Sequence, residues 1–217
     1  MIQDGLNFSK DKIYTGVNKG TLGFMQDLSE QDILSLIKYI EFEQELKVRK
    51  VYVSLVKVFL IDGSSLEYFA LNEVLVSGQN QSKISFEEHL NGEFLQNVSG
   101  SGIVISTSTG DTALSMSAGG AIDFSKNVHL VCTLDKPIKN IAFGNFIANT
   151  LICDTIKLKL KPAENICIII DGRKKDIDSS LIESVEVSID DKTNYFNKLD
   201  LRNYSKVRIV REKILGN

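Results

Sequence analysis

Short runs of β-branched residues, separated by turn-forming pieces, fill most of this chain and constrain its fold more than any other feature. The connections between them are rich in Gly, Asp, Asn and Ser, as in DGSS, SGQNQS and DDKTN. Short strands with close turns favour antiparallel sheets packed face to face, so we expect a mainly β, β-sandwich-like fold with a few helices. The expected strands are Val48 to Ile61, Leu71 to Val76, Ile103 to Thr107, Leu130 to Cys132, Ile152 to Leu160, Ile166 to Ile170, Ser184 to Ile189 and Lys206 to Val210.

One clear helix precedes these strands, from Ser29 to about Glu45, because Ile33, Leu36, Ile37 and Ile40 form a helical stripe. A second, short helix is expected inside 109–116. We see no linker, no low-complexity tract and no repeat of fixed period. The 217 residues are therefore expected to form a single domain, with one helix in residues 1–45 and a β-rich part in residues 46–217.

Charge and hydropathy exclude several classes of partner. The net charge of −3 provides no basic field to hold a nucleic acid backbone. No apolar stretch approaches the roughly 18 residues needed to span a bilayer, and no signal core follows Met1. We therefore expect a cytoplasmic protein without nucleic acid or membrane partners.

The cysteines and histidines do not suggest a metal site. Cys132, Cys153 and Cys167 are odd in number and lie in apolar contexts, which predicts buried free thiols. His89 and His129 have no second ligand at metal spacing, so we expect surface or packing histidines.

The stretch from Ser101 to Ala121 reads SGIVISTSTGDTALSMSAGGA, a β-rich run that breaks into a loop of Ser, Thr, Gly and Ala. Exposed backbone N–H groups and short hydroxyls suit the polar edge of a nucleotide, although such residues are also the usual formers of solvated turns. The order TxTGxTAxxxSAGG is narrower than this composition. It resembles the loop of the NAD kinase family that lies over the bound dinucleotide.

Two further segments carry the same resemblance in the same order. GVNKGTLGF, from Gly16 to Phe24, is similar to the family's GxNxGxLGF, and ALNEVLV, from Ala70 to Val76, is similar to its ALNEVVI. Asp171-Gly172, after the apolar run ICIII, is a weaker echo of a family strand that ends in DG. The resemblance implies the C-terminal, dinucleotide-binding domain of NAD kinases.

The resemblance also implies a site. Asn72 and Glu73 match the pair that holds the adenosine ribose, and the loop would contact base and ribose through hydroxyls and backbone. A homodimer or homotetramer is implied as well. The ligand-binding residues expected in this way are Asn18, Phe24, Asn72, Glu73, Ser101, Thr107, Thr109, Gly110, Asp111, Thr112, Ala113 and Leu114, with Gly16, Gly20 and Gly23 on the same wall as Asn18.

The loop departs from the family at positions expected to touch the ligand. Leu114 stands where the family has a stacking Tyr, Asp111 where it has Ser, Ser101 where it has Asp and Ser108 where it has Pro. A lost aromatic face removes stacking, and a new carboxylate repels a nearby phosphate. From these changes we expect a ligand other than NAD itself, of the ADP-ribose type.

The family motif GGDG, whose Asp activates the ribose hydroxyl, has only Asp4-Gly5 as a counterpart among residues 1–14. Phosphoryl transfer depends on positioning and electrostatics. We therefore expect no catalytic residue and no required cofactor, only non-catalytic binding, for sequestration or sensing of an adenine nucleotide of the NAD or ADP-ribose type. A viral counter-defence sponge is one such use.

Two alternatives stay open. The first is a divergent or truncated NAD kinase that phosphorylates NAD to NADP with ATP or polyphosphate and Mg²⁺, with Asp4 as its catalytic residue. The second is a structural oligomerisation domain with a collapsed pocket.

Overall fold

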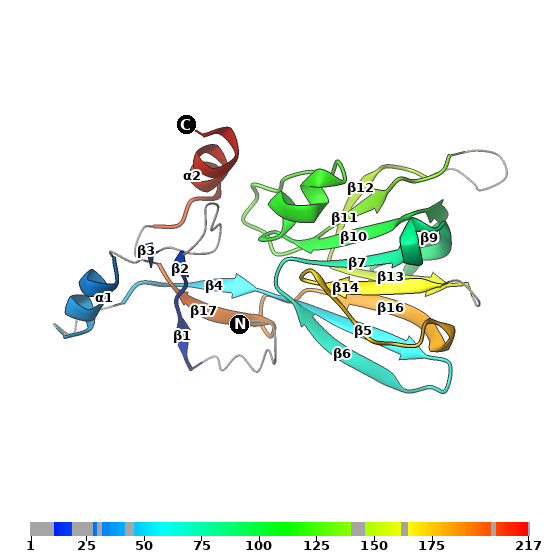
Figure 1. The fold of residues 1–217 in the computed structure, drawn as a ribbon, viewed down its shortest axis with the longest axis horizontal. Helices are drawn as coiled ribbons and strands as arrows, with labels where there is room; N and C mark the ends of the chain where they lie inside the picture. The colour runs from blue at the N-terminus through cyan, green and yellow to red at the C-terminus, as the bar shows by residue number, and fades with distance from the viewer. Residues whose placement is uncertain are drawn as a thin grey trace. The chain divides into compact units, whose positions relative to one another are not determined.

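The computed structural model describes residues 11–18, 28–29, 32–41, 46–139, 146–161, 165–200 and 203–216. Within them the chain divides into two compact units (Figure 1). The first unit contains Tyr52–Asn194, and the second combines residues up to Val51 with Tyr195 and the residues after it.

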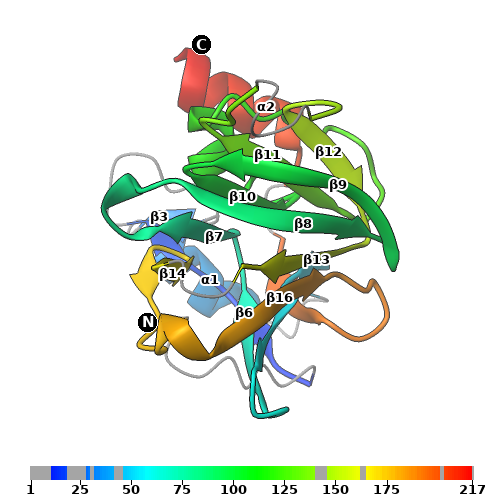
Figure 2. The same ribbon diagram turned by 90° about the vertical axis from the view of Figure 1, so that its right-hand side faces the viewer.

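The first unit consists of two six-stranded antiparallel sheets (Figures 1 and 2). The expectation of a mainly β fold is therefore confirmed. In sheet order, the first sheet contains β12 (Thr150–Cys153), β11 (Leu130–Asp135), β10 (Gly102–Thr107), β7 (Glu73–Gly78), β14 (Ile166–Ile170) and β15 (Arg173–Lys174). The second contains β6 (Ser65–Ala70), β5 (Ser54–Leu60), β16 (Ile182–Ser188), β13 (Thr155–Leu160), β8 (Ile84–Leu90) and β9 (Glu93–Gly100).

The hydrophobic core contains apolar side chains from both sheets. In β7, Val74 and Val76 are fully buried in this core, while Glu73, Leu75 and Ser77 alternate with them and lie on the outer face of the sheet. Each buried Val or Ile of this kind contributes about 1.5–3 kcal/mol relative to an exposed one. The alternation fixes the register, because a slip by one residue would place Glu73 in the core.

The cysteines follow the expectation in part. All three are free thiols, and Cys132 and Cys153 are buried in the core, whereas Cys167 is only half-buried on β14. Cys167 lies between Ile166 and Ile168, which face the core, so its own side chain is on the outer face of the sheet.

The second unit combines two small sheets with helices. Its three-stranded sheet has the order β1 (Ile13–Tyr14), β17 (Tyr195–Leu199), β4 (Val48–Tyr52), and β2 (Val17–Asn18) pairs with β3 (Leu28–Ser29). The helix expected from Ser29 to Glu45 is present as α1 (Asp32–Glu41).

The expected strand at Lys206–Val210 is wrong, because these residues form helix α2, followed by a further helical turn, η4 (Arg211–Leu215). Ser205 is the N-cap residue, and its Oγ accepts a hydrogen bond from the Arg208 amide at 3.4 Å. Capping of this kind stabilises a helix start and here outweighs the β-branched composition.

Two long expected strands are each divided. The run from Val48 to Ile61 breaks at Val53 into β4 and β5, and the run from Ile152 to Leu160 breaks at Asp154 into β12 and β13. In the second case the two halves join different sheets, so Asp154 is a corner of the sandwich. No helix in the described part of the chain is long and apolar enough to cross a membrane.

Candidate functional site

The ends of three neighbouring strands, β10, β7 and β14, lie side by side at one end of the first sheet. In the antiparallel register, Ser106 near the end of β10 pairs with Glu73 at the start of β7, and Ile170 at the end of β14 pairs with Val74. The segments that follow or precede these residues therefore lie side by side, although they are distant in sequence. We call the group of residues 71–73, 107–110 and 171 the ledge.

Asp171 holds the ledge together. Its carboxylate accepts hydrogen bonds from three consecutive amides, those of Leu71 at 2.8 Å, Asn72 at 2.6 Å and Glu73 at 3.2 Å. The Asp171 amide donates in return to the Glu73 carbonyl at 3.0 Å. Asp171 and Gly172 both have positive φ, 47° and 77°, as a two-residue hairpin between β14 and β15 requires. Asp171 thus fixes the backbone from which the Asn72 and Glu73 side chains project.

Thr107 joins the loop to the same backbone. Its Oγ1 donates to the Leu71 carbonyl at 2.7 Å and accepts from the amides of Thr109 at 3.2 Å and Gly110 at 3.3 Å. A Cβ on Gly110 would overlap the backbone of Asn72. Only glycine allows the loop to lie this close to Asn72.

Glu73 is the titratable side chain of the ledge with a perturbed pKa. Burial, and secondarily repulsion from Asp171, raises the pKa of Glu73 to about 7. Its Oε2 is buried without a hydrogen-bond partner. Near neutral pH this carboxyl group exists in both protonation states, so it can either donate or accept a hydrogen bond. Asn72 beside it is half-buried, and no hydrogen bond of its side chain is found among the described residues.

The loop after Gly110 turns into the short helical segment η2 (Asp111–Ser115), as expected for 109–116. Ser115 is fully buried, and its Oγ lies 3.0 Å from Thr133 Oγ1 on the outer face of β11. The segment therefore covers the outer face of β10 and β11, where Val104 and Val131 are buried beneath it.

Asp111 has no exposed surface and accepts the Asp123 amide at 2.7 Å. Asp123 Oδ2 in turn lies 2.7 Å from His129 Nε2. Asp111 thus tethers the loop to the segment that returns to β11. The sequence did not indicate this role, nor the organising role of Asp171 beyond the echo of a DG pair.

The structure brings together Asn72, Glu73, Thr107, Thr109 and Gly110. Beyond the ledge on η2, Thr112 is half-buried, Ala113 is exposed and Leu114 is 39% exposed.

Ser101 lies apart from these residues. It sits before the opposite end of β10, about 20 Å from Thr107 at about 3.3 Å per residue. There its amide donates to the Asp135 carbonyl at 3.0 Å, and its own carbonyl accepts from Gly78 at 3.1 Å. Asn18 belongs to β2 in the second unit. Phe24, Gly20, Gly23 and Asp4 lie outside the described residues.

The chain matches the ATP-NAD kinase C-terminal domain over residues 71–198, more than half of its length. It is 29% identical over 206 residues to an NAD kinase of Flavobacterium psychrophilum, covering 92% of this chain and 66% of that protein. It is 34% identical over 160 residues to a bifunctional NADP phosphatase/NAD kinase of Methanocaldococcus jannaschii, covering 72% of this chain and 27% of that protein. The chain thus spans less than two thirds of these relatives.

Two solved structures share the fold. Yeast NADH kinase, in a complex with NADH, superposes with a TM-score of 0.77 at 21% identity over 93% of this chain and 58% of that one. An NAD kinase from Archaeoglobus fulgidus, in a complex with ATP, superposes with a TM-score of 0.69 at 16% identity over 94% of this chain and 74% of that one.

The expectation of non-catalytic sequestration or sensing is wrong. A relative that is similar over 92% of the chain is an NAD kinase, and this finding favours the alternative of a divergent kinase. That expectation rested on Asp4-Gly5 as the counterpart of the family's GGDG motif, and these two residues lie outside the described part of the chain. The match across the ledge, the loop and both sheets leads to one conclusion: this chain belongs to the family of the ATP-NAD kinase C-terminal domain.

Proposed function

We propose that this chain is the nucleotide-binding part of an NAD kinase and takes part in phosphorylating NAD to NADP. One observation carries the proposal: the family match begins at Leu71 and includes the entire ledge. The ledge thus lies within the part of the chain that resembles the kinases.

The ledge has the chemistry that a ribose requires. A ribose hydroxyl both donates and accepts a hydrogen bond, and Glu73 with a pKa of about 7 can supply either partner. The unpartnered Oε2 of Glu73 and the Asn72 carboxamide are polar groups for which a ligand would provide hydrogen bonds. Thr109 lies at the same place and adds a hydroxyl group.

Phosphoryl transfer also needs a phosphate donor with its metal ion. The described residues contain no group of three or more His, Cys, Asp or Glu side chains that could hold a metal. Mg²⁺ commonly binds to substrate phosphates with only one or two protein carboxylates. We therefore expect Mg²⁺ to be held mainly by the phosphates of ATP or polyphosphate.

The direct test is formation of NADP from NAD with Mg²⁺ and either ATP or polyphosphate. We expect activity with at least one donor, and a loss of at least about tenfold in kcat/KM for Asn72→Ala, corresponding to one lost hydrogen bond to a buried group. Asn97→Ala is the matched control, because Asn97 is exposed on β9 in the other sheet. Absence of NADP with both donors, or equal activity of the two variants, would contradict the proposal.

A homodimer or homotetramer remains a prediction from the resemblance. Light scattering coupled to size-exclusion chromatography would measure the molar mass directly. A mass corresponding to one chain, 24.1 kDa, would refute it.

A further inference from the structure

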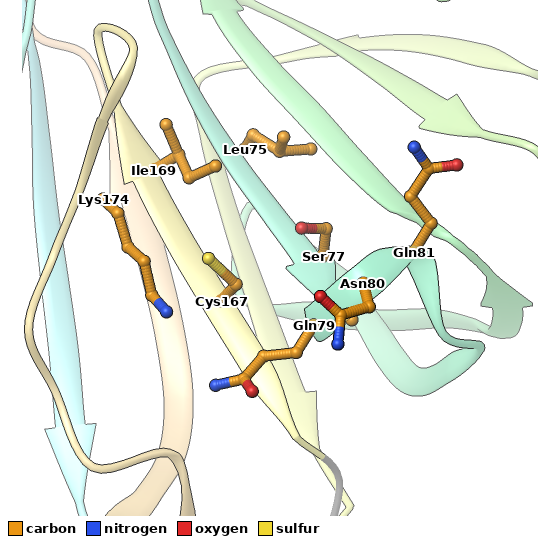
Figure 3. Close-up of a pocket in the computed structure, with 9 residues that line it drawn as sticks. Leu75, Ser77, Gln79, Asn80, Gln81, Cys167, Ile169 and Lys174 are labelled. Atoms are coloured by element: carbon orange, nitrogen blue, oxygen red, sulfur yellow. The ribbon is translucent and has the colours of Figure 1, made fainter.

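A pocket of about 340 Å³ lies on the outer face of the first sheet, beyond the area that η2 covers (Figure 3). We call it the outer-face pocket. It is lined by Leu75, Ser77, Gly78, Gln79, Asn80, Gln81, Cys167, Ile169 and Lys174. Its volume is near the lower end of the range for small-molecule sites, about 300–1,000 Å³. None of these residues belongs to the ledge.

The register of three strands builds the pocket in two rows. Leu75, Ile169 and Lys174 are neighbours across β7, β14 and β15, and Ser77 pairs with Cys167 in the next row. The first row provides an apolar wall from Leu75 and Ile169. Figure 3 shows the Lys174 side chain extending along the sheet towards the end of the pocket that holds Gln79.

The far end of the pocket is polar. After β7 the chain turns through Gln79–Gln81, with positive φ of 53° at Asn80 and 60° at Gln81. Non-glycine residues adopt this conformation at an energetic cost. The turn closes tightly on Gly78, where a Cβ would overlap the Ser82 backbone. It thereby places the Asn80 carboxamide beside Ser77, whereas the Gln79 side chain extends towards the side of the pocket where Cys167 and Lys174 lie, as Figure 3 shows.

The charges of the lining have one sign. Lys174 is its charged side chain, and the lining contains no carboxylate. Gln81 Oε1 accepts a hydrogen bond from Nζ of Lys136, which is not part of the lining, at 2.9 Å. No hydrogen bond of the Ser77, Gln79 or Asn80 side chains is found among the described residues. These donors and the Lys174 ammonium suit an anionic group, and the Leu75–Ile169 wall suits a short apolar body attached to it.

We propose that the outer-face pocket binds a small organic anion, a carboxylate or phosphate group on a short apolar body, at a site separate from the ledge. The two sites share the outer face of β7, because Glu73 and Leu75 are two residues apart on the same side of the strand. The inference does not depend on kinase activity.

Cys167 provides a reporter for the test, because it lies in the pocket and is half-buried, whereas Cys132 and Cys153 are 2% and 5% exposed. The folded full chain would be treated with iodoacetamide, and the rate of Cys167 alkylation followed by mass spectrometry. Benzoate and phenyl phosphate are the anionic probes, benzyl alcohol is the neutral probe, and Cys167→Ser confirms the assignment of the label.

We expect at least one of the two anions to slow the alkylation of Cys167, and benzyl alcohol to have no effect. Lys174→Gln should raise the concentration of anion needed for half-protection about tenfold, as expected for loss of a charged hydrogen-bond partner. Lys159→Gln, an exposed lysine on β13 of the other sheet, should leave that concentration unchanged.

Three outcomes would overturn the proposal. In the first, neither anion slows the alkylation of Cys167 at millimolar concentration. In the second, benzyl alcohol slows it as much as the anions do. In the third, the anion concentration needed for half-protection is the same in Lys174→Gln and in the unaltered protein. Protection of Cys167 by NAD that Asn72→Ala abolishes would assign the pocket to the nucleotide and refute its separateness. Far-ultraviolet circular dichroism of each variant would establish that the fold is intact.

Discussion

Replacing Asp171 by Asn tests the hydrogen bonds that organise the ledge while preserving the backbone. Asn is among the residues that best tolerate the left-handed conformation, so the φ of 47° at this position remains accessible. The substitution removes the negative charge and one of the two acceptor oxygens. Three amides donate to this carboxylate, at 2.6 to 3.2 Å.

The magnitude follows from these three contacts. A hydrogen bond to a charged group contributes about 1.5–3 kcal/mol, and a neutral one about half of that. In the Asp171→Asn variant, the new carboxamide would keep one oxygen for the Asn72 and Glu73 amides, while its NH₂ group would face the Leu71 amide. We therefore expect the free energy of unfolding of the first unit to fall by about 2–3 kcal/mol.

Urea denaturation would measure the loss as a lower midpoint with an unchanged slope, and amide hydrogen exchange at Leu71, Asn72 and Glu73 should become faster. Asp178→Asn is the matched control, because the Asp178 carboxylate accepts two hydrogen bonds from Ser180 in an exposed turn. The reasoning is refuted if Asp171→Asn destabilises the protein no more than Asp178→Asn does.

Three further predictions follow from the same region. Because the pKa of Glu73 is raised to about 7 in the folded protein, its contribution to stability is present below the unfolded value of 4.5 and is lost as pH rises towards 7. The free energy of unfolding of Glu73→Gln should therefore equal that of the unaltered protein at about pH 4 and exceed it by about 1–2 kcal/mol at about pH 8, after allowance for solvent screening. Urea denaturation at the two pH values measures the difference between the two proteins, and a difference that is the same at both pH values would contradict the prediction. Gly110→Ala should weaken NAD binding in calorimetry, because the new Cβ overlaps the Asn72 backbone and displaces the loop; unchanged affinity would mean that the loop position is irrelevant to the ligand. Leu114→Tyr should strengthen NAD binding by about 1–3 kcal/mol if the exposed residue 114 faces a base, whereas no change would place it outside the site.

Local patterns in the sequence predicted much of the first unit. β-branched composition identified β7, β10 and β14. Buried residues alternate with half-buried ones in β7 and β14, whereas all six residues of β10 are buried. Four strands of this unit were missed, β6, β8, β9 and the two-residue β15. In β8 the run Glu87, Glu88 and His89 conceals a strand that nevertheless buries Ile84 and Phe86.

The buried Glu88 explains why composition failed there. The residue is 1% exposed, and its carboxylate accepts a hydrogen bond from the Gln96 side chain on the neighbouring strand β9. Burial of an acid raises its pKa, as it does for Glu88, and such burial is possible only with a partner. The partner is supplied by tertiary structure, which no local pattern contains.

The family motifs indicated residues that lie close together in the structure, but not the hydrogen bonds that hold them in place. The motif positions Asn72, Glu73, Thr109 and Gly110 do lie together. The expected place of Ser101 beside them is not observed, because a strand separates the two ends of β10. Asp171 was only an echo in the sequence, since its role depends on amides about a hundred residues away.

Asp171 lies about a hundred residues along the chain from the amides that it binds, so the ledge forms only when distant parts of the chain have come together. The ledge closes a loop of about a hundred residues, and the entropy of that closure must be offset by strand pairing on both sides before the carboxylate reaches Leu71. Proteins dominated by such non-local contacts fold slowly. The ledge, which we propose as the nucleotide site, therefore forms late in folding: a nascent or partly unfolded molecule that already contains Asn72, Glu73 and the complete loop has no ledge until β14 is in place.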